Sequence, residues 1–168
     1  KKKSNIEDYS LNAVWKNNIN LNFKEFRKLH SFFWLFTLDL KSSSKITQNI
    51  VSNWIDENDK YKQGIWDLDI LSKRIIAWIS NSRLTYENSD TNYKLKFNST
   101  IKKQTNHLIN EIKSSDKFDD KIIGSTAIIL VGLAYQDKYY LKFGIELLKQ
   151  ILEFSLDKTN FPKSRNLR

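Results

Sequence analysis

Residues 121–135, KIIGSTAIILVGLAY, form the most apolar part of the chain. Drawn as a helix, this segment is surrounded by apolar side chains on nearly every side, a pattern typical of a buried helix. Gly124 and Gly132 lie eight positions apart, which predicts a neighbouring helix packed closely against their face. The segment is shorter than the roughly 20 residues that a membrane-spanning helix needs. We therefore expect the most buried helix of a helical domain, and no membrane span.

Helical periodicity also governs the rest of the chain. Asn22 and Glu25 are spaced as a capping box, and Asp67 stands where the N-cap of a later helix belongs. One Pro and four Gly supply few turn residues for a β-sandwich or β-barrel. The sequence predicts an all-α fold of antiparallel neighbours, in one domain over residues 1–168 with a flexible lead-in of about 20 residues. The other helices expected from apolar spacing are 22–40, 43–54, 67–79, 91–113 and 138–154, with a loop over 81–90.

The charge balance is basic, with 28 Lys and Arg against 19 Asp and Glu and a formal net charge of +9. The cations are mainly Lys and are spread over every predicted helix, whereas nucleic-acid sites cluster Arg with exposed aromatic rings. Nucleic acid is therefore not an expected partner, although a helical nucleic-acid-binding or partner-binding protein stays open on charge alone. A general positive field also attracts an acidic polysaccharide.

Residues for metal or nucleophilic chemistry are scarce. The chain has no Cys, which excludes disulfides and thiolate zinc sites. His30 and His107 fall in different helices without a second ligand at metal-binding spacing, so we expect a structural or solvent role for each. Asp67 and Asp69 form a D-x-D pattern, but an N-cap followed by a first-turn acid explains it better than a metal site. We expect no metal and no cofactor.

Tryptophan side chains are the ligand contacts that composition offers. In a helical scaffold most of them belong to the core, but an aromatic face also holds sugar rings by stacking. Trp66 directly precedes a predicted helix start. Among Trp34, Trp54, Trp66 and Trp78, it is therefore the one that we expect to be partly exposed and to contact carbohydrate.

Several segments, taken in order, resemble a known family. The most specific are Trp66 with the RIIAWI run at 74–79, and the SRN run at 164–166. Over about residues 23–168, the order and rough spacing are similar to the N-terminal helical domain of the heparinase II/III-like polysaccharide lyases, a bacterial branch in particular. The other matching segments are LHSFFWL at 29–35, GSTA at 124–127, VGLA at 131–134, ELLKQIL at 146–152 and FPK at 161–163.

The resemblance implies part of an (α/α) toroid built from antiparallel helical hairpins, with a β-sandwich domain downstream. It implies cleavage of a uronate-containing acidic polysaccharide by β-elimination, and a place in the periplasm or cell envelope. The catalytic Tyr and His are expected beyond Arg168, so no catalytic residue is assigned here and we expect this segment to be inactive alone. The substrate-binding residues that we expect are Ser164, Arg165, Asn166, Trp66 and Arg74.

Both arginines have structural alternatives. Arg165 is expected either to bind a substrate carboxylate through two hydrogen bonds or to form a surface salt bridge. Arg74 is expected to bind substrate or, preferably, to pair with an acid such as Asp67 or Asp69.

The chain departs from the family just before the SRN run. The family often has DGGH there, where this chain has DKTNFPK at 157–163. That difference favours an alternative in which the domain is a non-catalytic carbohydrate-binding or scaffold module. The chain begins with Lys and contains no Met, which indicates a piece of a longer protein. If later hairpins of a toroid are missing, we expect an exposed apolar edge.

Overall fold

The computed structural model describes residues 21–39 and 41–155, which are mostly helical. These ranges contain no strand, so the predicted all-α fold is confirmed, while the toroid arrangement stays a prediction. The described elements are, in chain order, α1 (Phe23–His30), the 3-10 helix η3 (Phe33–Thr37), α2 (Ser44–Asn58), α3 (Leu68–Ser80), α4 (Ser82–Thr85), α5 (Thr91–Ile112), α6 (Phe118–Ala134) and α7 (Lys138–Ser155).

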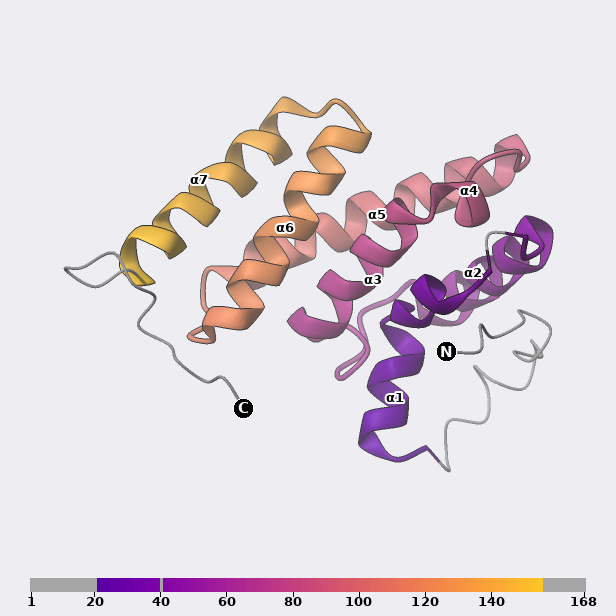
Figure 1. The fold of residues 1–168 in the computed structure, drawn as a ribbon, viewed down its shortest axis with the longest axis horizontal. Coiled ribbons are helices and arrows are strands. Elements are labelled where there is room, and N and C mark those ends of the chain that lie inside the picture. Colours follow the sequence, from indigo (N-terminus) through magenta and orange to yellow (C-terminus); the bar gives the residue numbers. More distant parts are fainter. Residues whose placement is uncertain (1–20, 40, 156–168) are drawn as a thin grey trace.

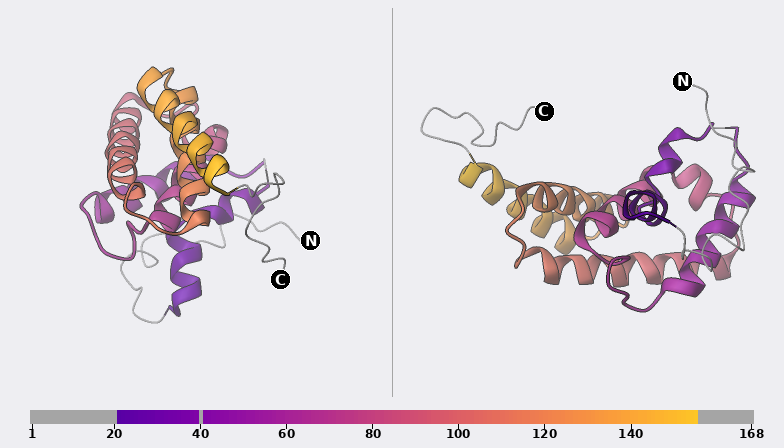
Figure 2. Two further views of the ribbon diagram at one scale, coloured as in Figure 1. Left: turned by 90° about the vertical axis from the view of Figure 1, so that its left-hand side faces the viewer. Right: turned by 90° about the horizontal axis from the view of Figure 1, so that it is seen from below.

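The helices form an elongated structure with α3 and α5 at its centre (Figure 1). α5 packs against α2, α3 and α6, and α3 also packs against α1, η3, α4 and α6. α6 and α7 form an antiparallel hairpin at one end of the molecule, and α2 lies at the opposite end (Figure 1, Figure 2). α7 packs mainly against α6, so the hairpin is joined to the rest of the fold through α6.

Helix starts follow the local capping signals. Asn22 and Glu25 form the expected capping box, in which the Glu25 amide donates to Asn22 Oδ1 at 3.0 Å. Asp67 occupies the N-cap position of α3, although its side chain accepts a hydrogen bond from the Gly64 amide instead of from the helix. α2 ends four residues later, and α6 begins three residues earlier, than apolar spacing predicts. The expected loop over 81–90 contains the short helix α4.

The predicted helix over 22–40 is wrong as a single element, because α1 ends at His30 and Phe32 breaks the chain direction. Phe32 has a left-handed backbone with a φ of 54°, and its ring is wholly buried. That ring stacks on Trp34 and meets Trp78 edge-on, with centroids 5.5 and 5.2 Å away. A left-handed residue costs about 1–2 kcal/mol, whereas burying a Phe side chain contributes about 1.5–3 kcal/mol. Long-range ring packing therefore outweighs continuation of the helix.

The most buried helix is α3, so the prediction that residues 121–135 would be the most buried is wrong. α3 is covered by α1, α5 and α6, and seven of its 13 residues are buried, against six of 17 in α6. One side of α6 stays open, and Leu133 there is 57% exposed. An apolar composition on every side of a helix does not by itself supply neighbours on every side.

Close helix packing at the two glycines of α6 is confirmed, but against two different helices. A Cβ on Gly132 would lie 2.5 Å from the Leu141 amide nitrogen of α7. A Cβ on Gly124 would collide with the side chain of Ile112 on α5. Only glycine lets α6 approach both neighbours this closely.

Apolar side chains are exposed at both ends of the structure, so the expected apolar edge is present. None of the described helices is long and apolar enough to cross a membrane. The most exposed apolar residues near the N-terminal end are Phe23, Phe33 and Phe36, and those on the α6–α7 hairpin are Leu133, Tyr139, Ile145 and Leu152.

Candidate functional site

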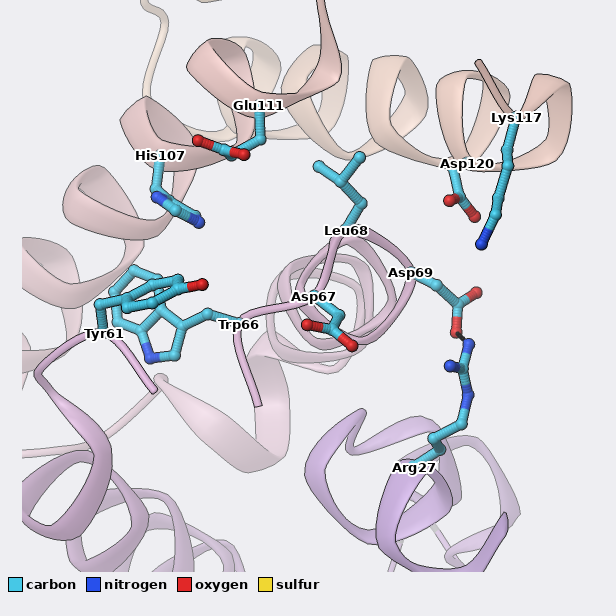
Figure 3. Close-up of a pocket in the computed structure, with 10 residues that line it drawn as sticks. All are labelled: Arg27, Tyr61, Trp66, Asp67, Leu68, Asp69, His107, Glu111, Lys117 and Asp120. Carbon is cyan, nitrogen blue, oxygen red and sulfur yellow. Dashed lines mark hydrogen bonds and ion pairs between the residues drawn. The ribbon is translucent and has the colours of Figure 1, made fainter. Parts of the chain in front are cut away.

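A pocket of about 260 Å³ opens at the N-terminal end of α3 (Figure 3). Its wall is built from α1, the loop before α3, the first turn of α3, the end of α5 and the start of α6. Aromatic side chains gather on one side of the pocket, and an Asp–Arg ion pair lies on the other side (Figure 3). The central helix of the fold thus begins at this pocket.

The aromatic side consists of Tyr61, Trp66 and His107. The His107 ring lies 5.4 Å from the Tyr61 ring and 5.3 Å from the Trp66 ring, measured between centroids. The Tyr61 and Trp66 rings are 6.4 Å apart. Three rings in mutual contact make an aromatic surface against which the apolar face of a ligand can pack.

Trp66 is buried, so the expectation that it would be partly exposed is wrong. It is only 4% exposed, and its indole Nε1 donates to the carbonyl of Asn58 at 3.2 Å. The exposed ring of the pocket is Tyr61, with 63% of its surface exposed. Trp66 therefore supports the pocket wall, and Tyr61 presents the accessible face.

Charged side chains form the rest of the wall. The Asp69 carboxylate pairs with Arg27 of α1, and with Lys73 one turn further along α3 at 2.6 Å. Asp67 Oδ1 accepts a hydrogen bond from the Gly64 amide at 3.0 Å. Four carboxylates thus face two cations, which leaves the pocket with a negative balance. The other charged residues of the wall are Glu111, Lys117 and Asp120.

Arg74 lies in the core instead of the pocket, and it pairs with neither Asp67 nor Asp69, so that expectation is wrong. Asp69 is five positions before Arg74 and projects from a different face of α3, while Asp67 is about two turns away. The Arg74 side chain is fully buried, which leaves it no access to a substrate. Its Nε donates to Gln104 Oε1 at 3.1 Å, and its Nη1 donates at 3.0 Å to the carbonyl oxygens of both His30 and Ile65.

The Arg74 guanidinium is a buried cation that pairs with no carboxylate in the described part of the chain. Its Nη2 has no hydrogen-bond partner among the described residues, and neither has the nearby Gln104 Nε2. The guanidinium carbon lies 4.2 Å from the centre of the Trp54 ring, in a cation–π contact. Burial lowers the pKa of Arg74 to about 9, so the group stays charged at neutral pH.

His30 lies beside this cation and has the structural role expected for it. Its Nδ1 accepts a hydrogen bond from Trp54 Nε1 at 3.0 Å, which requires a neutral imidazole. Burial, and then the charges of Arg74 and Lys62, lower the pKa of His30 to about 3. The ring is therefore neutral in physiological conditions and orients the Trp54 side chain.

The remaining expected substrate contacts, Ser164, Arg165 and Asn166, lie outside the described residues. Tyr61 and Arg27 are the pocket residues that sequence analysis missed. Tyr61 stands in the polar run KYKQG at 60–64, and a lone aromatic residue among polar neighbours is a signal for exposure that was available. Arg27 had no such signal, because its partner Asp69 lies 42 positions away.

Comparison of the chain with protein-family models, with curated proteins and with solved structures gives no match. The class of protein is therefore defined by the fold and the pocket: an all-helical domain with an aromatic and charged pocket at the start of its central helix. Within residues 21–39 and 41–155, no group of three His, Asp or Glu side chains is placed to hold a metal ion.

Proposed function

We propose that this chain is the helical, glycan-binding part of a polysaccharide lyase that cleaves uronate-containing acidic polysaccharide by β-elimination. The observation that carries the proposal is the exposed Tyr61 ring, which stands beside Trp66 and His107 in a pocket rimmed by hydrogen-bonding groups. A sugar ring has an apolar C–H face and a rim of hydroxyl groups. A site for it needs an aromatic surface and nearby polar groups, and this pocket offers both.

The charge of the pocket limits which sugar unit it would hold. With four carboxylates against two cations, and Arg27 already paired with Asp69, the pocket would repel a uronate. The carboxylates of Asp67 and Glu111 would instead accept hydrogen bonds from the hydroxyls of an uncharged sugar unit. The uronate unit of the same polymer is expected at Arg165 and its neighbours, in keeping with the family resemblance.

The cleavage step itself would use groups that the resemblance puts beyond Arg168. A base removes the proton at C5 of the uronate, the electron pair forms the C4–C5 double bond, and the glycosidic C4–O bond breaks. An acid protonates the departing oxygen, and a polar side chain stabilises the negative charge that develops on the carboxylate. We therefore expect this chain alone to bind the polymer without cleaving it.

The test is incubation of the longest protein that carries this sequence with uronate-rich glycans, followed by detection of the ultraviolet-absorbing unsaturated end. A calorimetric titration of the present chain with the same glycans measures binding separately. The absence of both cleavage and binding with every acidic glycan tried, or cleavage by hydrolysis, would contradict the proposal.

Tyr61→Ala examines the pocket directly, with Tyr139→Ala as its matched control, because both tyrosines are 63% exposed and only Tyr61 lines the pocket. Loss of the stacking contact should weaken glycan binding by roughly threefold to tenfold. Tyr139→Ala should leave the affinity unchanged. Equal effects of the two changes would remove the pocket from the proposal.

A non-catalytic carbohydrate-binding module is the second candidate. It is favoured by the pocket itself, whose aromatic wall and hydrogen-bonding rim suffice for binding. In this case the longer protein binds the glycan, Tyr61→Ala weakens that binding, and no unsaturated product forms.

A further inference from the structure

A second pocket, of about 380 Å³, lies at the opposite end of α3 from the candidate glycan site. The length of α3 separates the two pockets by about 20 Å. Its wall comes from the end of α3, α4, the first half of α5 and the end of α6. The residues that the argument uses are Trp78, Tyr86, Phe97, Asn98, Ala134 and Tyr135.

Aromatic rings make up most of this wall. The Phe97 ring lies 5.4 Å from the Trp78 ring and 5.3 Å from the Tyr86 ring, measured between centroids. No charged side chain lines the pocket among the described residues. Such a wall favours an uncharged ligand with a flat, apolar body, because a charged ligand would lose its hydration without gaining a partner.

One edge of the pocket carries a fixed chain of hydrogen bonds. The Tyr135 hydroxyl donates to Asn98 Oδ1 at 2.8 Å, and Asn98 Nδ2 donates to the Tyr86 hydroxyl at 3.1 Å. Burial raises the pKa of Tyr135 well above its ordinary value, so the phenol keeps its proton. The Asn98 amide is thus held in one orientation and does not move freely into the pocket.

The indole nitrogen of Trp78 is the one group in the wall that lacks its partner. Trp78 is fully buried, and its Nε1–H makes no hydrogen bond among the described residues. A buried donor without an acceptor is costly, by about the free energy of desolvating the group. A ligand that brings one acceptor oxygen to this nitrogen removes that cost, which no purely apolar ligand can do.

We propose that this pocket binds a small uncharged aromatic or alicyclic molecule whose single carbonyl or ether oxygen accepts a hydrogen bond from Trp78 Nε1. The aromatic wall holds the apolar body of the ligand, and the unpartnered indole donor selects for the oxygen. This site is separate from the glycan site, and it does not depend on the function proposed above.

Acetophenone and cumene are suitable probes, because they share size and shape and differ in the carbonyl oxygen. Each is titrated into the full chain while the indole N–H signals are followed by nuclear magnetic resonance, with the Trp78 signal assigned from Trp78→Phe. Acetophenone should bind roughly threefold to tenfold more tightly than cumene and move the Trp78 signal downfield. Equal affinity of the two probes with no shift of that signal, or no binding of either, would overturn the proposal.

Trp78→Phe risks unfolding the core, so a change at the rim provides an independent test. Ala134 is exposed and lines the pocket at the end of α6. Ala134→Phe should fill the pocket and abolish binding of acetophenone, whereas Ala134→Ser should keep the wild-type affinity. Unchanged binding to the Ala134→Phe variant would mean that the probe occupies another place, and the proposal would fail.

Discussion

The two ends of the molecule are held together in opposite ways. In the helical body, which we define as α1 to α5 with η3, large rings fill the interior, and Trp54 meets Trp78 edge-on at 5.4 Å. In the α6–α7 hairpin the backbones come into contact where side chains are missing. A Cβ on Gly144 would lie 2.7 Å from Ile129 Cγ1, and one on Gly132 would meet the α7 backbone. The body therefore depends on side-chain volume, and the hairpin depends on its absence.

Polar groups follow the same division. The body buries Arg74, Gln104 and His30 completely and satisfies most of their hydrogen bonds internally. The charged side chains of α7, by contrast, are largely exposed, as in the pair Lys142–Glu146 with 78% and 58% side-chain exposure. Exposed pairs of this kind contribute little to stability. Changes in the body should therefore affect global stability, and changes in the hairpin should act locally.

The largest effect is expected from Trp54→Ala in the body. Trp54 is fully buried, contacts Phe32 and Trp78, and donates to His30. Its loss should reduce the free energy of unfolding by about 3–5 kcal/mol, measured by denaturant titration. Phe23→Ala, at a ring that is 71% exposed, serves as the control and should change stability little. Similar losses from both would deny that the rings of the body dominate stability.

A smaller and local effect is expected from Gly132→Ala in the hairpin. The added methyl group would press on the Leu141 backbone, and overpacking of this kind costs about 1–3 kcal/mol. Hydrogen exchange should show faster opening of α7 and unchanged protection of α3. Thr126→Ala, at an exposed position of the same helix, is the matched control and should protect α7 as the wild type does. Equal loosening of α3 would break the distinction between body and hairpin.

Acid should weaken the body through His30. The folded protein holds this imidazole at a pKa of about 3, whereas the unfolded chain binds a proton near pH 6.5. The stability is complete above pH 6.5, and it should fall by roughly 1.4 kcal/mol for each pH unit between 6.5 and about 3. The comparison of denaturation curves at several pH values with those of His30→Gln isolates this contribution. Identical pH dependence in the two proteins would contradict it.

The smallest effect is expected from Gln104→Glu, which should stabilise the body. A carboxylate at this position would accept hydrogen bonds from both Nε and the unpartnered Nη2 of Arg74, and would balance its buried charge. The gain is on the order of 1 kcal/mol, because the new carboxylate must itself be desolvated. Thermal denaturation at neutral pH measures it. Gln104→Leu, which leaves the Arg74 Nε without its acceptor, should destabilise the protein.

Local signals in the sequence were sufficient for most of the helices. Capping residues such as Asn22 and Asp67 act within a few positions, so helix starts could be predicted well from spacing alone. The break at Phe32 could not be predicted, because it depends on rings 22 and 46 positions away at Trp54 and Trp78. Such a break needs the tertiary structure before it makes physical sense.

The candidate site was less accessible from sequence. Trp66 was correctly singled out as a residue near a site, but its burial depends on the packing of Tyr61 and His107 from other elements. Arg74 seemed suited to an acidic partner, and only the position of Gln104 on α5 shows that a neutral amide takes that place. Partners separated by 30 or more positions leave no periodic signature in a chain.

The distribution of indoles has a spectroscopic consequence. All five Trp residues of the chain precede residue 118, so α6 and α7 contain none. Trp54 and Trp78, nearly perpendicular and 5.4 Å apart, should couple their transitions and give a strong near-ultraviolet circular dichroism signal. Fluorescence excited at the indole band would report on the body without any label, while opening of the hairpin would leave that emission almost unaltered.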